Sequence, residues 1–217
     1  MLFRSEAVDS PWVTRSSVAL RSGIGASASG KVSAAERGTA HHAFLQWVDL
    51  ARTESALDLR NEAHRIQTLD LMREEELAQL DFQALEAFWS SELGRLLREH
   101  RKSVHREIPF TARLGVVELR RLGMFGDGDG LQLSDDEFVV VQGQVDLVVL
   151  LENETWVIDF KTDAVGEESV MARAREYRTQ MLIYAHAMQG IYRKPVTRRV
   201  LCFLSARRMI DLSAEMG

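Results

Sequence analysis

Two aspartates and a lysine lie at a spacing that could hold a metal ion beside a cation. Asp146 falls in one apolar run, 138–151, and Asp159 and Lys161 fall in the next, 155–161. Both runs predict β-strands, and the short polar segment between them predicts a hairpin. Because side chains two residues apart share a face of a strand, Lys161 points to the same side as Asp159. The three side chains form one candidate site.

The turn of this hairpin decides how closely the two aspartates face each other. If Glu152-Asn153 is a two-residue turn, Asp146 lies directly opposite Asp159, with the Cβ atoms about 5 Å apart. If Asn153-Glu154 forms the turn, the aspartates become diagonal neighbours. One ion is within reach of both carboxylates in either register.

The residues around the aspartates predict that the hairpin is buried on both faces, since valine, leucine, isoleucine and phenylalanine fill both sides of it. Two buried carboxylates repel each other and lose hydration. A divalent cation resolves both problems, because carboxylate oxygens are preferred ligands of Mg²⁺. A structural ion pair between an aspartate and Lys161 is the alternative, and spacing alone does not separate the two.

The remaining pattern predicts an α/β domain at 34–217, after an irregular N-terminal arm at 1–33 that is rich in glycine and serine. Apolar spacing predicts helices at 34–52, 55–67, 70–79, 82–100 and 167–191, and two-residue alternation predicts strands at 103–112, 138–151, 155–161 and 199–205 and allows one at 115–120. The predicted order is helix, three strands, helix, strand (αβββαβ), a mixed sheet flanked by helices. A helical insertion at about 55–100 follows the first core helix.

Composition narrows the class of protein. The chain has 217 residues, a formal net charge of −5 and one cysteine, Cys202. A single cysteine excludes an intramolecular disulfide framework and a four-cysteine iron–sulfur cluster carried by this chain alone. No run approaches the roughly 18 apolar residues of a membrane span, and no secretion signal is evident, so we expect a cytoplasmic protein without a membrane partner. The acidic balance is awkward for unaided DNA binding and suits a basic partner that carries the DNA.

Several segments, taken in order, resemble the motifs of the PD-(D/E)XK nuclease superfamily, and more narrowly the RecB-like nuclease domain that closes AddA and RecB helicase–nucleases. The segments are Gly38-Thr39-Ala40-His41-His42 (G-x-x-x-H), Arg106-Glu107-Ile108-Pro109-Phe110 (E-x-P-F), Gly143-Gln144-Val145-Asp146 (G-x-x-D), Asp159-Phe160-Lys161-Thr162 (D-Y-K-T, with Phe160 in place of tyrosine) and Gln180-Met181-Leu182-Ile183-Tyr184 (Q-x-x-x-Y). The resemblance covers about 34–205. It implies a restriction-endonuclease-like core, and the ordered combination is far more specific than any one motif.

The resemblance also implies a ligand set. Asp146, Asp159 and the backbone carbonyl of Phe160 would bind Mg²⁺, and Lys161 would orient the attacking water and stabilise the phosphate. His42 would be an additional metal ligand, favoured over its neighbour His41 by its place in the motif. A nitrogen ligand makes Mn²⁺ a plausible substitute.

The sequence leaves the orientation of other motif residues open. Glu107 could supply a third carboxylate or face solvent, because its strand alternates. Gln180 and Tyr184 share one helical face with Tyr177. We expect Gln180 to form a hydrogen bond with the motif strands or with DNA, whereas core packing suits Tyr177 better.

The function implied is a Mg²⁺-dependent deoxyribonuclease of exonuclease type in DNA repair and recombination, acting on single-stranded DNA ends by one-step attack of water. The chain carries no helicase motor, which allows a separate helicase as its partner. The alternative is a catalytically inactive PD-(D/E)XK scaffold or DNA-binding module. Intact Asp146, Asp159 and Lys161 argue against that alternative.

Overall fold

The structure is a computed structural model, and it describes residues 33–124, 137–163 and 165–214. The chain divides into two units, Met1–Lys31 and Val32–Gly217, and the described residues all lie in the second. The predicted N-terminal arm, apart from Ser33, lies outside the described residues.

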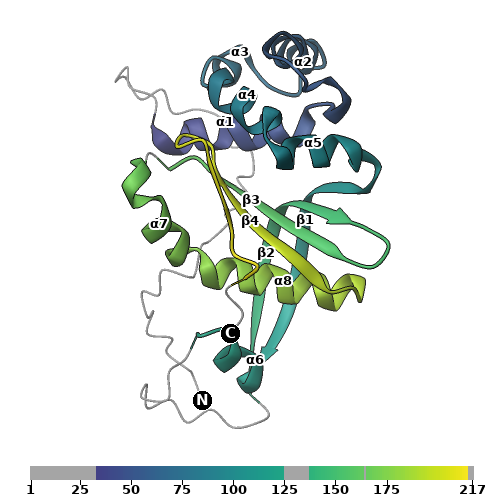
Figure 1. Ribbon diagram of the computed structural model, residues 1–217, viewed down its shortest axis with the longest axis vertical. Coiled ribbons are helices and arrows are strands. Elements are labelled where there is room, and N and C mark those ends of the chain that lie inside the picture. Colours follow the sequence, from purple (N-terminus) through teal and green to yellow (C-terminus); the bar gives the residue numbers. More distant parts are fainter. Residues whose placement is uncertain (1–32, 125–136, 164, 215–217) are drawn as a thin grey trace, which may run out of the picture. The chain divides into compact units, whose positions relative to one another are not determined.

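A five-stranded mixed sheet forms the centre of the described unit (Figure 1). Its strands follow the spatial order β1 (Val104–Gly115), β2 (Phe138–Leu150), β3 (Thr155–Lys161), β4 (Val196–Phe203) and β5 (Arg208–Asp211). β3 and β4 are parallel, while the other neighbouring pairs are antiparallel. The parallel pair is joined by a helical crossover, as parallel strands require.

The first five helices pack on one face of this sheet and lie at the top of Figure 1. They are α1 (Ala34–Trp47), α2 (Ala56–Thr68), α3 (Glu74–Leu77), α4 (Phe82–Ser90) and α5 (Glu92–Glu99), with 3₁₀ turns at Leu50–Arg52 and Arg101–Ser103. Phe44, Leu59 and Leu85 are fully buried here and share an apolar core with Ile158 and Phe160 of β3. The insertion after α1 is therefore held to the sheet by hydrophobic burial.

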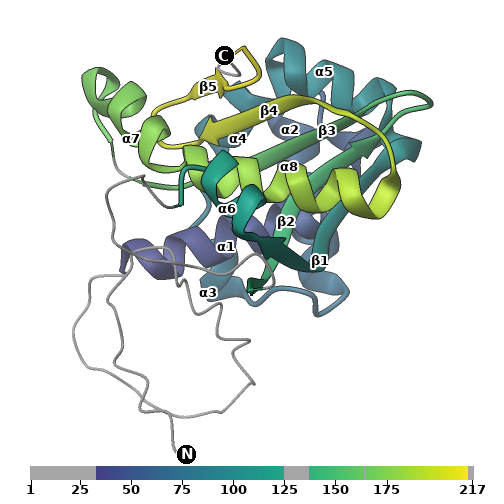
Figure 2. The same ribbon diagram turned by 90° about the horizontal axis from the view of Figure 1, so that it is seen from below.

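Helices α6 (Val116–Arg121), α7 (Val170–Glu176) and α8 (Arg178–Tyr192) cover the opposite face. α8 crosses the middle of the sheet (Figure 2), and Met181 and Met188 on its inner side are buried against Val148, Val157 and Leu201. The central strands are thus apolar on both sides. The predicted α/β class, a mixed sheet flanked by helices, is confirmed.

Two predicted elements differ from the structure, and one strand of the structure was not predicted. The stretch allowed as a strand at 115–120 is helix α6, because Val116, Leu119 and Leu122 are buried together at helical spacing. The strand predicted at 199–205 begins earlier, at Val196, and β5 has no counterpart among the predicted strands. Short strands at a sheet edge carry little periodic signal.

Two predicted helices are each divided. The helix predicted at 82–100 breaks at Ser91, whose hydroxyl caps α5 by accepting a hydrogen bond from the N–H of Gly94 at 3.1 Å. The helix predicted at 167–191 is a 3₁₀ turn (Glu167–Ser169) followed by α7 and α8, which meet at Tyr177. Neither proline nor glycine marks this second break.

Among the described residues, no helix is both long and apolar enough to cross a bilayer.

Candidate metal centre

The hairpin of β2 and β3 has the register predicted with residues 152–153 as a two-residue turn. Its last backbone pair is Leu147↔Ile158, so Asp146 and Asp159 occupy the next position along the two strands. Beyond this pair the carboxylate of Asp146 replaces the ladder, because its Oδ2 accepts a hydrogen bond from the N–H of Phe160 at 2.7 Å. The two motif strands are therefore joined through a side chain at the point where they separate.

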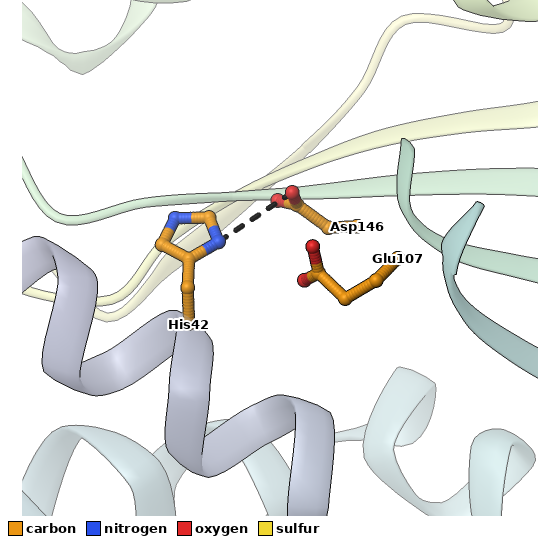
Figure 3. Close-up of side chains that lie close together, drawn as sticks. All are labelled: His42, Glu107 and Asp146. Atoms are coloured by element: carbon orange, nitrogen blue, oxygen red, sulfur yellow. Dashed lines mark ion pairs between the residues drawn. The ribbon is translucent and has the colours of Figure 1, made fainter. Parts of the chain in front are cut away.

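Three side chains from three elements meet at this point (Figure 3). His42 of α1, Glu107 of β1 and Asp146 of β2 each offer one ligand atom, and these atoms lie within 4.8 Å of one another. His42 Nδ1 lies 3.4 Å from Asp146 Oδ1. This is the one group of three His, Cys, Asp or Glu residues with such spacing in the part of the chain that the structure describes.

Helix α1 presents His42 because its start is defined. Ser33 and Glu36 form a capping box, in which the backbone N–H of Glu36 donates to Ser33 Oγ and the N–H of Ser33 donates to Glu36. Gly38 lets the helix approach the end of β3, since a Cβ at this position would lie 2.8 Å from Thr162 Oγ1. The first and fourth motifs are therefore in contact.

The backbone of Glu107 is strained. Its φ is +52°, in the left-handed region that residues other than glycine seldom adopt. The flanking pairs Arg106↔Leu147 and Ile108↔Val145 place Glu107 across from Asp146. Strain of this kind costs on the order of 1–3 kcal/mol and concentrates at functional sites. The sequence allowed Glu107 to face either the site or solvent. In the structure the Glu107 carboxylate points to Asp146 (Figure 3).

Burial and mutual repulsion shift the pKa values of these acids upward. Burial, followed by the charge of Asp146, raises the pKa of Glu107 to about 7. The same two causes raise the pKa of Asp159 to about 6, against the opposing effect of Lys161. Burial alone would lower the pKa of His42, but its hydrogen bond and the surrounding carboxylates raise it overall. The cluster thus brings carboxylates together where burial and mutual repulsion disfavour their negative charge.

This donor set fits a divalent cation. One imidazole nitrogen and two carboxylates lie at mutual distances that one ion can span, and the repulsion between the acids would be relieved by its charge. Asp159 adds a further sign of fit. It is 2% exposed, and among the described residues no hydrogen bond of regular geometry reaches its Oδ2, although Lys161 forms an ion pair with that oxygen.

Asp159 lies beside the triad and not within it, and its carboxylate contacts Lys161 Nζ at 2.8 Å. Phe160 contacts the site through its backbone N–H, which donates to Asp146. The predictions that Asp159 and the Phe160 carbonyl bind the metal remain predictions.

A chain of polar contacts joins Lys161 to α8. Lys161 Nζ donates to Gln180 Oε1 at 2.9 Å, and Gln180 Nε2 donates to the hydroxyl of Tyr184 at 2.7 Å. Phe110 packs edge-to-face on Tyr184, and a Cβ at Gly143 would lie only 2.8 Å from the Phe110 ring. The E-x-P-F, G-x-x-D, D-x-K-T and Q-x-x-x-Y segments therefore meet in space.

The two adjacent histidines have different environments. His41 is 5% exposed, its Nδ1 bonds to the carbonyl of Arg37 at 2.8 Å, and its Nε2 accepts from the N–H of Asp81 at 3.0 Å. It ties α1 to the start of α4. His42 instead faces Asp146, so the structure places the residue favoured by the motif beside the acids.

Sequence reasoning missed the contact between Tyr177 and Lys161, together with the two residues that hold Tyr177, Asp163 and Arg173. Tyr177, expected to be a packing residue, lies with its ring 4.0 Å from Lys161 Nζ, and its hydroxyl donates to Asp163 at 2.8 Å. Arg173 bonds to the same carboxylate. The one signal in the sequence was the three-residue spacing between Tyr177 and Gln180.

Comparison with known proteins identifies the family. The family model for the PD-(D/E)XK nuclease superfamily matches residues 14–213. An ATP-dependent helicase/nuclease subunit of Lacticaseibacillus paracasei is 34% identical over 186 residues, which are 85% of this chain and 14% of that protein. The protein of the same name from Listeria welshimeri is 29% identical over 193 residues, covering 86% of this chain and 15% of that protein.

The chain thus spans about one seventh of the length of these relatives. The family model, in contrast, matches nearly the whole of this chain. The match includes every segment that meets around His42, Glu107, Asp146 and Lys161. The chain belongs to the PD-(D/E)XK nuclease superfamily.

Proposed function

We propose that this chain is a metal-dependent deoxyribonuclease that hydrolyses phosphodiester bonds at single-stranded DNA ends, in DNA repair and recombination. One observation carries the proposal. The ligand atoms of His42, Glu107 and Asp146 lie within 4.8 Å of one another at the end of the strand pair that carries Asp159 and Lys161. Membership of a nuclease superfamily supports hydrolysis as the chemistry of that cluster.

Each residue would have a defined role. His42, Glu107, Asp146 and Asp159, with the Phe160 carbonyl, would hold Mg²⁺ or Mn²⁺. When bound, the ion supplies positive charge that stabilises the phosphate oxygens in the transition state.

The protein's own groups would then position the water and the phosphate. Lys161 would orient the attacking water through its remaining N–H and stabilise the phosphate by its positive charge. Gln180 would fix the lysine ammonium, and Tyr184 would fix the Gln180 amide, through the contacts at 2.9 and 2.7 Å. Water would attack phosphorus in one step, without a covalent intermediate. Its oxygen forms the new P–O bond as the P–O bond to the leaving deoxyribose oxygen breaks, and the proton that the water loses balances the one that the leaving oxygen gains.

The delivery of the DNA strand is a further part of the proposal. The matched relatives are named as ATP-dependent helicase/nuclease proteins, and this chain corresponds to about one seventh of them. We infer that a helicase module feeds single strands to the site. The net charge of −5 suits a complex in which a more basic partner makes most of the contacts with the DNA phosphates.

A cleavage assay tests the proposal. End-labelled linear single-stranded DNA, linear duplex DNA and circular single-stranded DNA are incubated with the chain in Mg²⁺, Mn²⁺ or EDTA. We expect metal-dependent loss of linear single strands and resistance of the circle. Asp159→Ala and Lys161→Ala should each reduce the rate on the order of a hundredfold or more. Glu99→Gln, which changes an exposed carboxylate on α5, is the matched control.

The other outcomes are informative. Cleavage in EDTA, or full activity of Asp159→Ala, would remove the proposed mechanism. Cutting of the circle would show an endonuclease in place of an end-dependent enzyme. Tight DNA binding without cleavage in either metal would favour the inactive scaffold.

A further inference from the structure

An aromatic ring that lies outside the proposed ligand set covers the proposed catalytic lysine. Lys161 Nζ lies 4.0 Å from the centroid of the Tyr177 ring. A cation within about 6 Å of an aromatic face is attracted by the negative potential of that face. At 4.0 Å the Tyr177 ring therefore attracts the ammonium group of Lys161.

The remaining neighbours of the ammonium group show why the ring matters. Lys161 Nζ contacts Asp159 Oδ2 at 2.8 Å and Gln180 Oε1 at 2.9 Å. Asp159 is also a proposed metal ligand, so its carboxylate would be shared between the ion and the lysine. Gln180 and Tyr177 are neighbours for which the ion does not compete. They would keep Lys161 in place when the metal is bound.

Tyr177 is itself held in a fixed orientation. Its hydroxyl donates to Asp163 Oδ2 at 2.8 Å, and Arg173 Nε bonds to the same oxygen at 3.3 Å. The guanidinium of Arg173 lies 5.0 Å from the Tyr177 ring centroid. Burial and the bond to Asp163 raise the pKa of Tyr177 to about 12, so the phenol stays protonated and continues to donate.

The location of Tyr177 in the chain supports a role beyond packing. It is the single residue between α7 and α8, with φ −84° and ψ −3°. Gln180 follows three residues later on α8, so one segment supplies both the ring and the amide that contact Lys161. The break between α7 and α8 falls at the residue whose ring lies against Lys161.

We propose that Tyr177 is a positioning residue for Lys161, and that Asp163 and Arg173 orient the Tyr177 ring. The ring face and the Gln180 amide hold the ammonium group toward the scissile phosphate while Asp159 engages the metal. This inference rests on the proposed nuclease function. It assigns a role to three residues that lie outside the ligand set, Asp163, Arg173 and Tyr177.

Lysine-selective NMR tests the contact without any measurement of activity. The lysines of the chain are Lys31, Lys102, Lys161 and Lys194, so the spectrum of ¹³C-lysine-labelled protein is simple, and Lys161→Arg assigns the signal of interest. Ring currents of Tyr177 should move the Lys161 ε-CH₂ protons upfield of the other lysines. Tyr177→Phe should keep this shift and Tyr177→Leu should remove it. An unchanged Lys161 signal in Tyr177→Leu would overturn the proposal.

Kinetics test the consequence of the contact. We expect Tyr177→Leu to lower kcat about tenfold with KM little changed. Loss of a cation–π contact that holds Lys161 in the transition state corresponds to about that change in rate. Tyr177→Phe should recover most of kcat, because the phenyl face remains. Tyr192→Leu, a partly buried tyrosine at the other end of α8, is the matched control and should leave kcat unchanged.

A double substitution separates positioning from a general structural effect. If Tyr177 acts through Lys161, Tyr177→Leu has no further effect on the residual activity of Lys161→Ala. An equal additional loss in that background would contradict the proposal. Failure of the nuclease function itself has a different signature, which is absence of cleavage by the unsubstituted chain. That result would remove the catalytic role of Tyr177, and the NMR shift would still show whether the contact exists.

Discussion

The carboxylate of Asp146 accepts a hydrogen bond from the backbone N–H of Phe160, with Oδ2 2.7 Å from the nitrogen. The backbone ladder between β2 and β3 ends one residue earlier, at Leu147↔Ile158. One oxygen of Asp146 is therefore committed to β3, while the other, Oδ1, lies 3.4 Å from His42 Nδ1. This division couples the geometry of the strand pair to the geometry of the candidate metal centre.

Replacement of Asp146 should separate these two roles. Asp146→Asn keeps an oxygen that can accept from Phe160 and removes the charge, so we expect a folded protein whose melting temperature no longer rises with Mn²⁺. Asp146→Ala also leaves the buried N–H without its acceptor and should lower the free energy of unfolding by about 1–3 kcal/mol. Thermal denaturation with and without Mn²⁺ measures both effects. A normal response of Asp146→Asn to Mn²⁺ would exclude Asp146 as a ligand.

The stability of the metal-free protein should fall as pH rises, through Glu107. Its pKa is raised from 4.5 to about 7 by burial and by the charge of Asp146. The folded state therefore binds this proton more tightly than the unfolded state does. The resulting stabilisation is complete below about pH 4.5 and is lost as pH rises through about 7.

In EDTA, the free energy of unfolding of the unsubstituted protein should fall between about pH 5 and about pH 8. This fall should exceed that of Glu107→Gln by on the order of 2 kcal/mol. Urea denaturation of both proteins at the two pH values measures this difference. Mn²⁺ should restore the unsubstituted protein at the higher pH, where the carboxylate is free to bind it. Parallel pH profiles for the two proteins would show that Glu107 titrates normally.

The adjacent histidines should respond oppositely to substitution. His41→Ala removes a buried ring and its bonds to Arg37 and Asp81, so we expect a loss of about 2–4 kcal/mol in unfolding free energy with the response to Mn²⁺ retained. His42→Ala should be nearly as stable as the parent protein in EDTA and should lose most of the stabilisation by Mn²⁺. Denaturation curves in EDTA and in Mn²⁺ distinguish the two. The reverse pattern would move the proposed ligand to His41.

Gly143 should not tolerate a side chain. A Cβ there would lie 2.8 Å from two carbons of the buried Phe110 ring, which packs on Tyr184, so Gly143→Ala should cost about 1–3 kcal/mol. Gly190→Ala is the control, because a Cβ at that position of α8 meets nothing within 4 Å. This change should stabilise the protein by about 0.5–1 kcal/mol. Equal stability of the two variants would show that the Phe110 ring moves aside without cost.

Much of the central sheet could be predicted from the sequence because its signals are local. The two-residue turn at 152–153 sets the register of β2 and β3, and continuous apolar runs indicate burial on both faces. The segment at 115–120 was harder, since Val116, Val117 and Leu119 fit a strand as well as a helix. Burial of Val116 and Leu119 on one side of α6 favours the helix.

The sequence by itself determined which residue types are available and how the β2–β3 hairpin aligns Asp146 with Asp159 and Lys161, since register propagates along a hairpin from its turn. Tertiary structure alone decided that Glu107 turns toward Asp146 through a strained backbone, and that the helix breaks at Tyr177 to place its ring on Lys161. These features depend on contacts between segments far apart in the chain. No local propensity encodes them, because their free energy arises only when the sheet and both helical layers are assembled.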